Sequence, residues 1–184
     1  LTMPIHWDNP FWVILMGIEH QRIHLETSSV IIRRLPIETV RQLPLWGIFP
    51  ESGEAPQNKL VPVAGGRVVL GKSRDHPLYG WDNEFGRQEN DVWDFSASRY
   101  LVSNREYLGF VDDHGYEHEE YWTHEGWKWV VYSNATHPLF WIESLGGYRF
   151  RTMTQVIDIP WDWPVEVNYL EAKAFSNWLA NKTG

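Results

Sequence analysis

The chain has 184 residues and a net charge of −8, from 16 basic and 24 acidic side chains. This length is enough for one or two small domains with a real hydrophobic core. The charges are spread along the sequence without a basic cluster, which excludes the usual electrostatic basis for binding the phosphate backbone of nucleic acids.

Cysteine is absent from the sequence, which excludes disulfides, thiolate zinc sites and a cysteine nucleophile. Any metal must therefore be bound by His, Asp or Glu. The longest apolar run, residues 11–18, is too short to span a bilayer and lacks the flanks of a signal peptide. We accordingly expect a cytoplasmic protein that binds neither membranes nor nucleic acids.

Tryptophan is unusually frequent, with 12 residues in the chain. Each indole buries a large area and its N–H group needs a partner, so we interpret most of these side chains as core. The chain starts at Leu1 rather than Met and closes on Gly184, a residue typical of helix ends. These ends lead us to expect a segment of a longer protein.

Residues 8–35 are predicted to form one long helix. Asp8 or Asn9 can cap its first turn, and Pro10 suits the first helical position. Pro36 ends it. The apolar residues that recur near the 3.6-residue period are Phe11, Ile14, Leu15, Ile18, Leu25, Ile31, Ile32 and Leu35.

Residues 36–59 are rich in Pro and Gly and are predicted to form a connector. A domain boundary is expected within it, at residues 51–59. We therefore assign residues 1–50 to a first domain and residues 60–184 to a second.

The second domain is predicted to begin with strands. Two β-rich runs within residues 60–70, on either side of Gly65 and Gly66, indicate a hairpin. Residues 75–90 are predicted to be a polar, aromatic loop, and residues 98–102 a short strand.

Two helices with capping boxes are predicted further along the chain. Ser103 and Glu106 open one, and Asn168 and Glu171 cap the other, at residues 169–182. The core face predicted for the last helix consists of Leu170, Ala174, Phe175 and Trp178.

Between these helices, residues 122–141 are expected to be aromatic and loop-rich, and residues 148–159 to contain a strand. The mixture of helices and strands predicts the α+β class.

A His-x-x-x-His pair lies inside the first predicted helix. His20 and His24 project from one face, one turn apart, within reach of a single metal ion. Imidazole suits Fe, Zn, Cu and Ni. Glu19 precedes the first His instead of following it, so the segment is not the zincin pattern.

Such a pair also occurs as two solvent-exposed histidines on a helix, and two ligands do not complete a catalytic site. A third ligand must come from elsewhere. No spacing singles out one of the other histidines, which are His6, His76, His114, His118, His124 and His137.

Residues 17–29, Gly-Ile-Glu-His-Gln-Arg-Ile-His-Leu-Glu-Thr-Ser-Ser, strongly resemble the non-haem iron sulfoxide synthases of the ovothiol and ergothioneine pathways, in particular the ovothiol type that makes 5-histidylcysteine sulfoxide. Further stretches resemble the formylglycine-generating-enzyme-type domain of that family, in the family's order. These are residues 61–66, 79–84, 102–107, 115–116, 121–127 and 164–179.

The resemblance implies an α+β architecture, in which the end of a DinB-like helical bundle is followed by the first part of a formylglycine-generating-enzyme-type, C-type-lectin-like domain. It implies an Fe(II) site with three His ligands, of which His20 and His24 are two. The third belongs to an earlier bundle helix, so we expect residues 1–184 alone to be inactive. An all-His site leaves more positive charge on iron than two His and a carboxylate, which favours thiolate binding.

The implied activity is O₂-dependent. The sulfur of cysteine is joined to the imidazole ring of histidine in the ovothiol branch, and trimethylhistidine is the donor in the ergothioneine branch. Ile23 is apolar where ergothioneine-type relatives tend to carry Gln, which favours unmethylated histidine. The second domain would supply substrate contacts, and its candidates are Tyr79, Trp81, Asp82 and Asn83, which could equally form a structural turn.

Two other classes of function stay open at this point. A non-catalytic C-type-lectin-like binding module would explain the aromatic residues and treat the His pair as fortuitous. A zinc hydrolase or thiol transferase on a DinB-like bundle would also use histidine ligands. Metal analysis of the intact protein separates these classes from an iron enzyme.

Overall fold

The structure is a computed structural model that describes residues 3–45, 47–49 and 51–184. It divides into two compact units. The first unit comprises Leu1–Ile32 with Leu60–Ala97, and the second unit comprises Arg33–Lys59 with Ser98–Gly184. Helices and strands occur together, which confirms the predicted α+β class. The DinB-like bundle and the predicted domain boundaries stay predictions.

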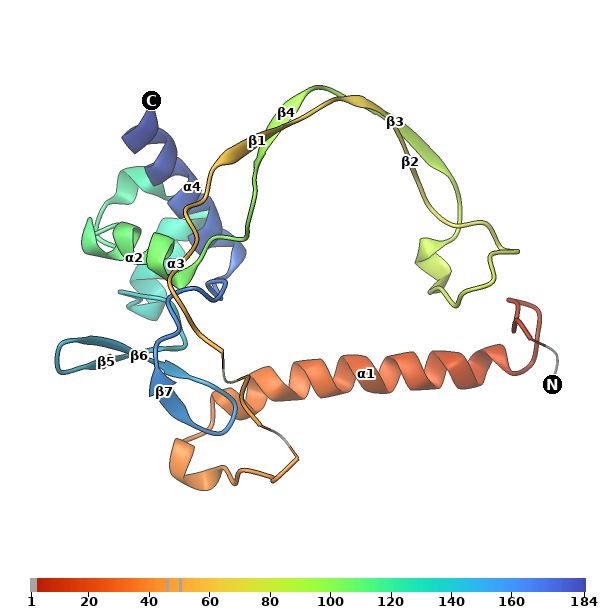
Figure 1. The fold of residues 1–184 in the computed structure, drawn as a ribbon, viewed down its shortest axis with the longest axis horizontal. Helices are drawn as coiled ribbons and strands as arrows, with labels where there is room; N and C mark the ends of the chain where they lie inside the picture. The colour runs from red at the N-terminus through yellow and green to blue at the C-terminus, as the bar shows by residue number, and fades with distance from the viewer. Residues whose placement is uncertain (1–2, 46, 50) are drawn as a thin grey trace. The chain divides into compact units, whose positions relative to one another are not determined.

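The first helix, α1, spans Trp12–Arg33 (Figure 1). Asn9 prepares its start, because the Asn9 side chain accepts a hydrogen bond from the Phe11 N–H at 2.9 Å and its carbonyl accepts one from the Trp12 N–H at 2.9 Å. The helix is therefore shorter at both ends than the predicted 8–35. None of its described residues is buried.

Four strands pair in twos to form a ribbon, visible in Figure 1. They are β1 (Leu60–Val63), β2 (Gly66–Leu70), β3 (Gln88–Val92) and β4 (Phe95–Ser98). β1 pairs with β4, and β2 pairs antiparallel with β3, with Gly66 opposite Val92. The predicted hairpin within residues 60–70 is wrong, because β1 and β2 follow one another along one side of the ribbon.

The environment of Gly65 explains why no hairpin turn forms within residues 60–70. A Cβ atom on Gly65 would lie 2.3 Å from the Val92 carbonyl oxygen and 2.6 Å from the Trp93 carbonyl carbon. Its N–H group donates to the Asp94 carboxylate at 2.7 Å. The glycine is thus required by a close approach between two backbones, and it is not the centre of a turn.

Two further boundaries differ from the predictions around this ribbon. The strand predicted at residues 98–102 lies earlier, as β4, and the chain bends at Arg99 and Tyr100. The loop predicted at residues 75–90 contains a short 3₁₀ turn, η2 (Asp82–Glu84), and its end already belongs to β3.

In the second unit, both predicted capping boxes are confirmed. Ser103 and Glu106 cap α2 (Asn104–Asp112), and Asn168 and Glu171 cap α4 (Tyr169–Thr183). In each box the side chain of the third helical residue accepts the N–H of the cap residue, at 2.9 and 2.8 Å.

A helix, α3 (His124–Ser133), forms half of the segment predicted to be loop-rich, so the prediction is wrong for these residues. Thr123 caps its start by accepting the Gly126 N–H at 3.0 Å. Asn134 ends it in the left-handed conformation, with φ of 51°. The preceding turn, η3, spans Glu119–Tyr121.

A three-stranded antiparallel sheet completes the second unit, in the order β5 (Trp141–Ser144), β6 (Gly147–Arg151) and β7 (Val156–Asp158). Trp141 lies opposite Phe150, and Phe150 opposite Ile157. The strand predicted within residues 148–159 is therefore confirmed.

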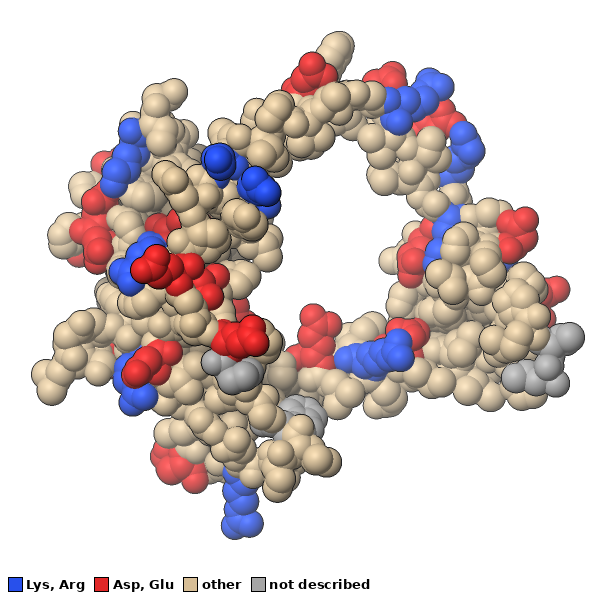
Figure 2. All heavy atoms as spheres, viewed as in Figure 1, with Lys and Arg blue, Asp and Glu red and all other residues tan. Residues whose placement is uncertain are grey.

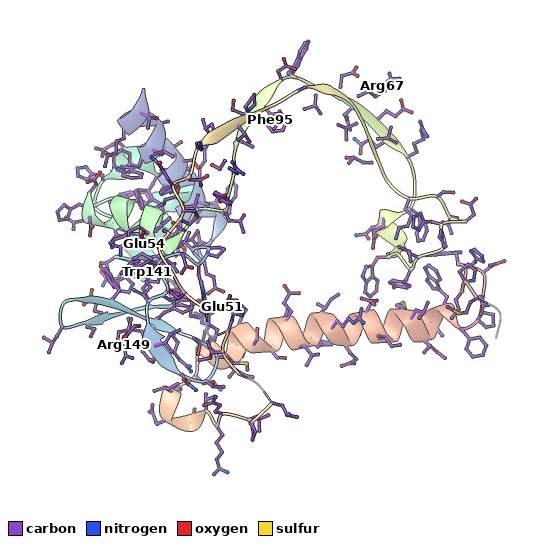
Figure 3. The ribbon with its side chains drawn as sticks, in the orientation of Figure 1. Glu51, Glu54, Arg67, Phe95, Trp141 and Arg149 are labelled. Atoms are coloured by element: carbon purple, nitrogen blue, oxygen red, sulfur yellow. The ribbon has the colours of Figure 1, made fainter. Side chains whose placement is uncertain are left out.

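Aromatic side chains form the core of the second unit. Phe110 is fully buried. The rings around it belong to Tyr107, Tyr116, Tyr121, Trp122, Phe175 and Trp178. Trp141 is also buried (Figure 3), and its indole N–H donates to the Asn104 side chain at 3.3 Å. The interpretation of tryptophan as core is confirmed here, whereas Trp93 on the ribbon is 88% exposed.

Among the described residues of the predicted connector, the backbone is irregular apart from one short 3₁₀ turn, η1 (Ile37–Thr39). Within the second unit, it is held against the later part of the chain by two hydrogen bonds. The Trp163 indole N–H donates to the Glu51 carbonyl at 3.0 Å, and Ser52 donates to Asp162 at 3.0 Å.

Acidic and basic side chains are interspersed on the face shown in Figure 2. Within the part of the chain that the structure describes, no helix is both long enough and apolar enough to cross a bilayer.

Candidate metal and substrate site

α1 places the two predicted metal ligands side by side. The ring centroids of His20 and His24 are 4.5 Å apart, with an angle of 63° between the ring planes. Both side chains lie on the same helix face because the residues are one turn apart. Both are exposed, and no described residue of α1 is buried. One metal ion could therefore contact both imidazoles.

The donor set is compatible with a metal but incomplete. Two neutral imidazoles suit iron or zinc, and a catalytic site needs at least one more protein ligand. Across residues 3–45, 47–49 and 51–184, no group of three or more His, Cys, Asp or Glu side chains is placed to hold a metal ion. The described chain thus offers two ligands of a larger set.

The other candidate residues belong to the loop that joins β2 to β3. Hydrogen bonds within the loop fix its shape. The Trp81 N–H donates to the Glu84 carboxylate at 2.8 Å, and the Lys72 ammonium donates to the Tyr79 carbonyl at 2.6 Å. Lys72 also forms an ion pair with Glu84 at 3.5 Å. The bond from Trp81, and then Lys72, lowers the pKa of Glu84, so this carboxylate stays ionised.

Tyr79 connects this loop to α1. Its ring lies 4.8 Å from the Trp12 ring and meets the Trp81 ring edge-on at 5.6 Å. Burial, and then the carboxylates of Glu19 and Glu84, raise the pKa of the Tyr79 hydroxyl. Tyr79 is therefore a protonated phenol that feels the charge of Glu19, the residue directly before His20.

The four candidate loop residues differ in exposure. Tyr79 and Trp81 are half-buried, whereas Asp82 and Asn83 are exposed at η2. The rings of Tyr79 and Trp81 are held by aromatic contacts, whereas the side chains of Asp82 and Asn83 are accessible to a ligand. Within the described residues, the loop meets the helix at the Trp12 ring and through the charge of Glu19, and not at the two histidines.

An aromatic cluster at the start of α1 was missed by sequence reasoning. Trp7 lies 5.3 Å from Trp12 and 5.0 Å from Phe85, and the Arg74 guanidinium lies 4.6 Å from the Trp7 ring centroid. This cluster holds the loop against the helix. The abundance of tryptophan was its only sequence signal, because its members come from segments far apart in the chain.

Residues 47–182 match the family of the Sulfatase-modifying factor enzyme 1-like domain. The chain belongs to this domain family. The match covers the second half of the predicted connector and nearly all of the second predicted domain, and it confirms the resemblance to the formylglycine-generating-enzyme type.

Three relatives match most of the chain. The chain is 32% identical over 174 residues to a hercynine oxygenase of Mycolicibacterium smegmatis, with 93% of this chain covered. It is 39% identical over 171 residues to the hercynine oxygenase of Mycolicibacterium thermoresistibile, with 89% covered, and 34% identical over 173 residues to that of Mycobacterium tuberculosis, with 93% covered. The chain spans only 39%, 36% and 40% of the lengths of these relatives.

Proposed function

We propose that His20 and His24 are two ligands of an Fe(II) ion in an O₂-dependent sulfoxide synthase. The observation that supports this most directly is the 4.5 Å separation of their rings on one helix face. The relatives named hercynine oxygenases support an oxidoreductase that uses oxygen and a small molecule. When bound, the metal would supply a site for O₂ and for the substrate thiolate.

The proposed reaction joins a thiol, an imidazole and O₂ to give a sulfoxide and one water. One bond forms between sulfur and an imidazole carbon, and one between sulfur and oxygen. The S–H and ring C–H hydrogens leave as the hydrogens of the water. O₂ accepts four electrons, two for each new bond to sulfur, so no further reductant is needed.

The imidazole donor has two candidates. The similarity to hercynine oxygenases favours hercynine, the trimethylated histidine, and we put this donor first. Unmethylated histidine with cysteine as the thiol remains the second candidate, as in the ovothiol pathway. It is favoured by Ile23, an apolar residue directly before His24 that cannot offer a hydrogen bond to the donor.

We further propose that the loop residues Tyr79, Trp81, Asp82 and Asn83 contact the substrate. Tyr79 can donate a hydrogen bond because its hydroxyl stays protonated. Asp82 is exposed and can attract the positively charged amino or trimethylammonium group of the substrate. Trp81 would orient the Tyr79 side chain through the contact between their rings.

α1 is proposed to be part of a DinB-like bundle in the natural protein. Its apolar side chains are exposed on several sides, including Ile14, Ile18 and Leu25 at 54%, 48% and 60%. A helix with this much apolar surface is stable in water only when other elements cover it.

The experiment uses the full-length natural protein, reconstituted separately with Fe(II) and with Zn(II). Oxygen uptake and sulfoxide formation are measured with cysteine or γ-glutamylcysteine as the thiol and with histidine or hercynine as the donor. We expect turnover with iron only, and a higher kcat/KM for hercynine. A higher kcat/KM for histidine would instead identify the protein as a sulfoxide synthase of the ovothiol type. Turnover with zinc alone, or with no pair of substrates, would contradict the proposal.

A further inference from the structure

A pocket of about 350 Å³ in the second unit is lined by three arginines and by apolar side chains. The arginines are Arg33, Arg34 and Arg151, and no acidic residue belongs to the described lining. This local excess of positive charge is opposite to the net charge of −8 of the whole chain.

Arg151 is 5% exposed, and its guanidinium is held by neutral groups. It donates to the carbonyls of Thr152, Met153 and Leu35 at 2.6, 3.0 and 3.3 Å. None of the ion pairs among the described residues gives it a carboxylate partner. A buried charge without a counter-charge is costly, so this guanidinium would gain from a nearby anion.

Arg33 is fixed in place beside Arg151 and adds a second positive charge there. Its guanidinium lies 3.5 Å from the centroid of the Phe140 ring, and it forms an ion pair with Glu166 at 2.6 Å. Its Nε–H group donates to the Arg151 carbonyl at 3.0 Å. The charge of Arg33, after burial itself, lowers the pKa of Arg151, which means that the two positive groups repel one another.

Arg34 supplies the accessible charge. It is exposed and has no hydrogen-bond or ion-pair partner among the residues that the structure describes. Of the three guanidinium groups, only that of Arg33 has an ion-pair partner among the described residues, which leaves two positive charges at the pocket without one.

We propose that this pocket binds a small organic carboxylate. The carboxylate group would meet Arg34 and Arg151, since the planar guanidinium matches two carboxylate oxygens. The apolar wall, which includes Ile37, Ile142 and Val156, would take a short aliphatic chain. The proposal concerns the second unit alone and does not rest on the proposed sulfoxide synthase activity.

The test is calorimetric titration of the full-length protein with 4-methylpentanoate, with the neutral isostere 4-methylpentanamide in parallel. We expect the carboxylate to bind at least about tenfold more tightly than the amide, because charged hydrogen bonds are lost in the amide. Equal affinities for the two, or no binding of the carboxylate, would overturn the proposal.

Variants locate the binding. Arg34→Gln should weaken binding about tenfold, and Ile142→Glu should abolish it by placing an acid at the pocket. The matched control is Arg41→Gln, because Arg41 is an exposed arginine outside the lining. His20→Ala should leave binding unchanged. An unchanged affinity in Arg34→Gln, or a loss in His20→Ala, would mean that the carboxylate binds elsewhere.

Discussion

The Tyr116 hydroxyl donates a 2.5 Å hydrogen bond to the Glu171 carboxylate inside the second unit. This bond links the chain after α2 to the first turn of α4, where Glu171 also accepts the Asn168 N–H at 2.8 Å. Glu171 is 3% exposed and Tyr116 4% exposed. Burial raises the pKa of Glu171 from its ordinary value of 4.5, although its two hydrogen bonds act in the opposite direction.

The first prediction concerns pH. Because the pKa of Glu171 is higher in the folded state than in the unfolded state, folding binds a proton between the two values. Stability from this group is therefore full below about pH 4.5 and is lost as pH rises through the folded-state pKa. Glu171→Gln removes the titration while keeping a side chain that can cap α4.

Urea unfolding of wild type and Glu171→Gln from pH 4 to pH 8 measures the effect. The stability of the variant relative to wild type should increase with pH over this range. Glu106→Gln, measured at one pH, makes the same exchange in the capping box of α2 and reports the cost of the amide alone. A pH profile of Glu171→Gln that is parallel to wild type would show that this carboxylate does not titrate in the range.

The second prediction concerns the aromatic core. Phe110→Ala should destabilise the protein by about 3–5 kcal/mol, because it leaves a cavity among rings that cannot collapse into it. The matched control is Tyr132→Ala at the end of α3, since Tyr132 is 91% exposed. The control should change the free energy of unfolding by no more than about 0.5 kcal/mol. Equal effects of both substitutions would contradict the position of Phe110.

The third prediction separates two adjacent glycines. Gly65→Ala places a methyl group 2.3 Å from the Val92 carbonyl oxygen, whereas a Cβ atom on Gly66 meets nothing within 4 Å. Gly65→Ala should cost about 1–3 kcal/mol through strain, and Gly66→Ala should be nearly neutral. Amide hydrogen exchange of β2 and β3 measures the local effect. If Gly66→Ala were the more damaging change, the strand pairing described here would be wrong.

The fourth prediction concerns the His pair. In the full-length protein, His20→Ala and His24→Ala should each lose most of the bound iron, because removal of one ligand leaves too few donors to retain the metal. Iron is measured by elemental analysis after purification. His118→Ala is the control, since His118 is an exposed histidine whose contacts are with Glu120 and Tyr121. Normal iron loading of both α1 variants would exclude these residues as ligands.

The sequence by itself determined features that depend on neighbouring residues. The capping boxes at Ser103 and Asn168 fix the starts of α2 and α4, because the partners lie three residues apart. The pairing of His20 with His24 follows from the helical repeat alone. α3 could also have been predicted from Thr123 and Asn134, but its many aromatic residues suggested irregular structure.

The tertiary structure alone decided which distant segments meet. Gly65 looks like a turn in the sequence, and only its contact with the Val92 backbone shows that it lies within a ribbon. The contact of Tyr79 with Trp12 and the placement of Arg151 beside Arg33 have no local pattern either. Local hydrogen bonds are specified by spacing along the chain, whereas these contacts depend on burial and charge summed over the folded unit.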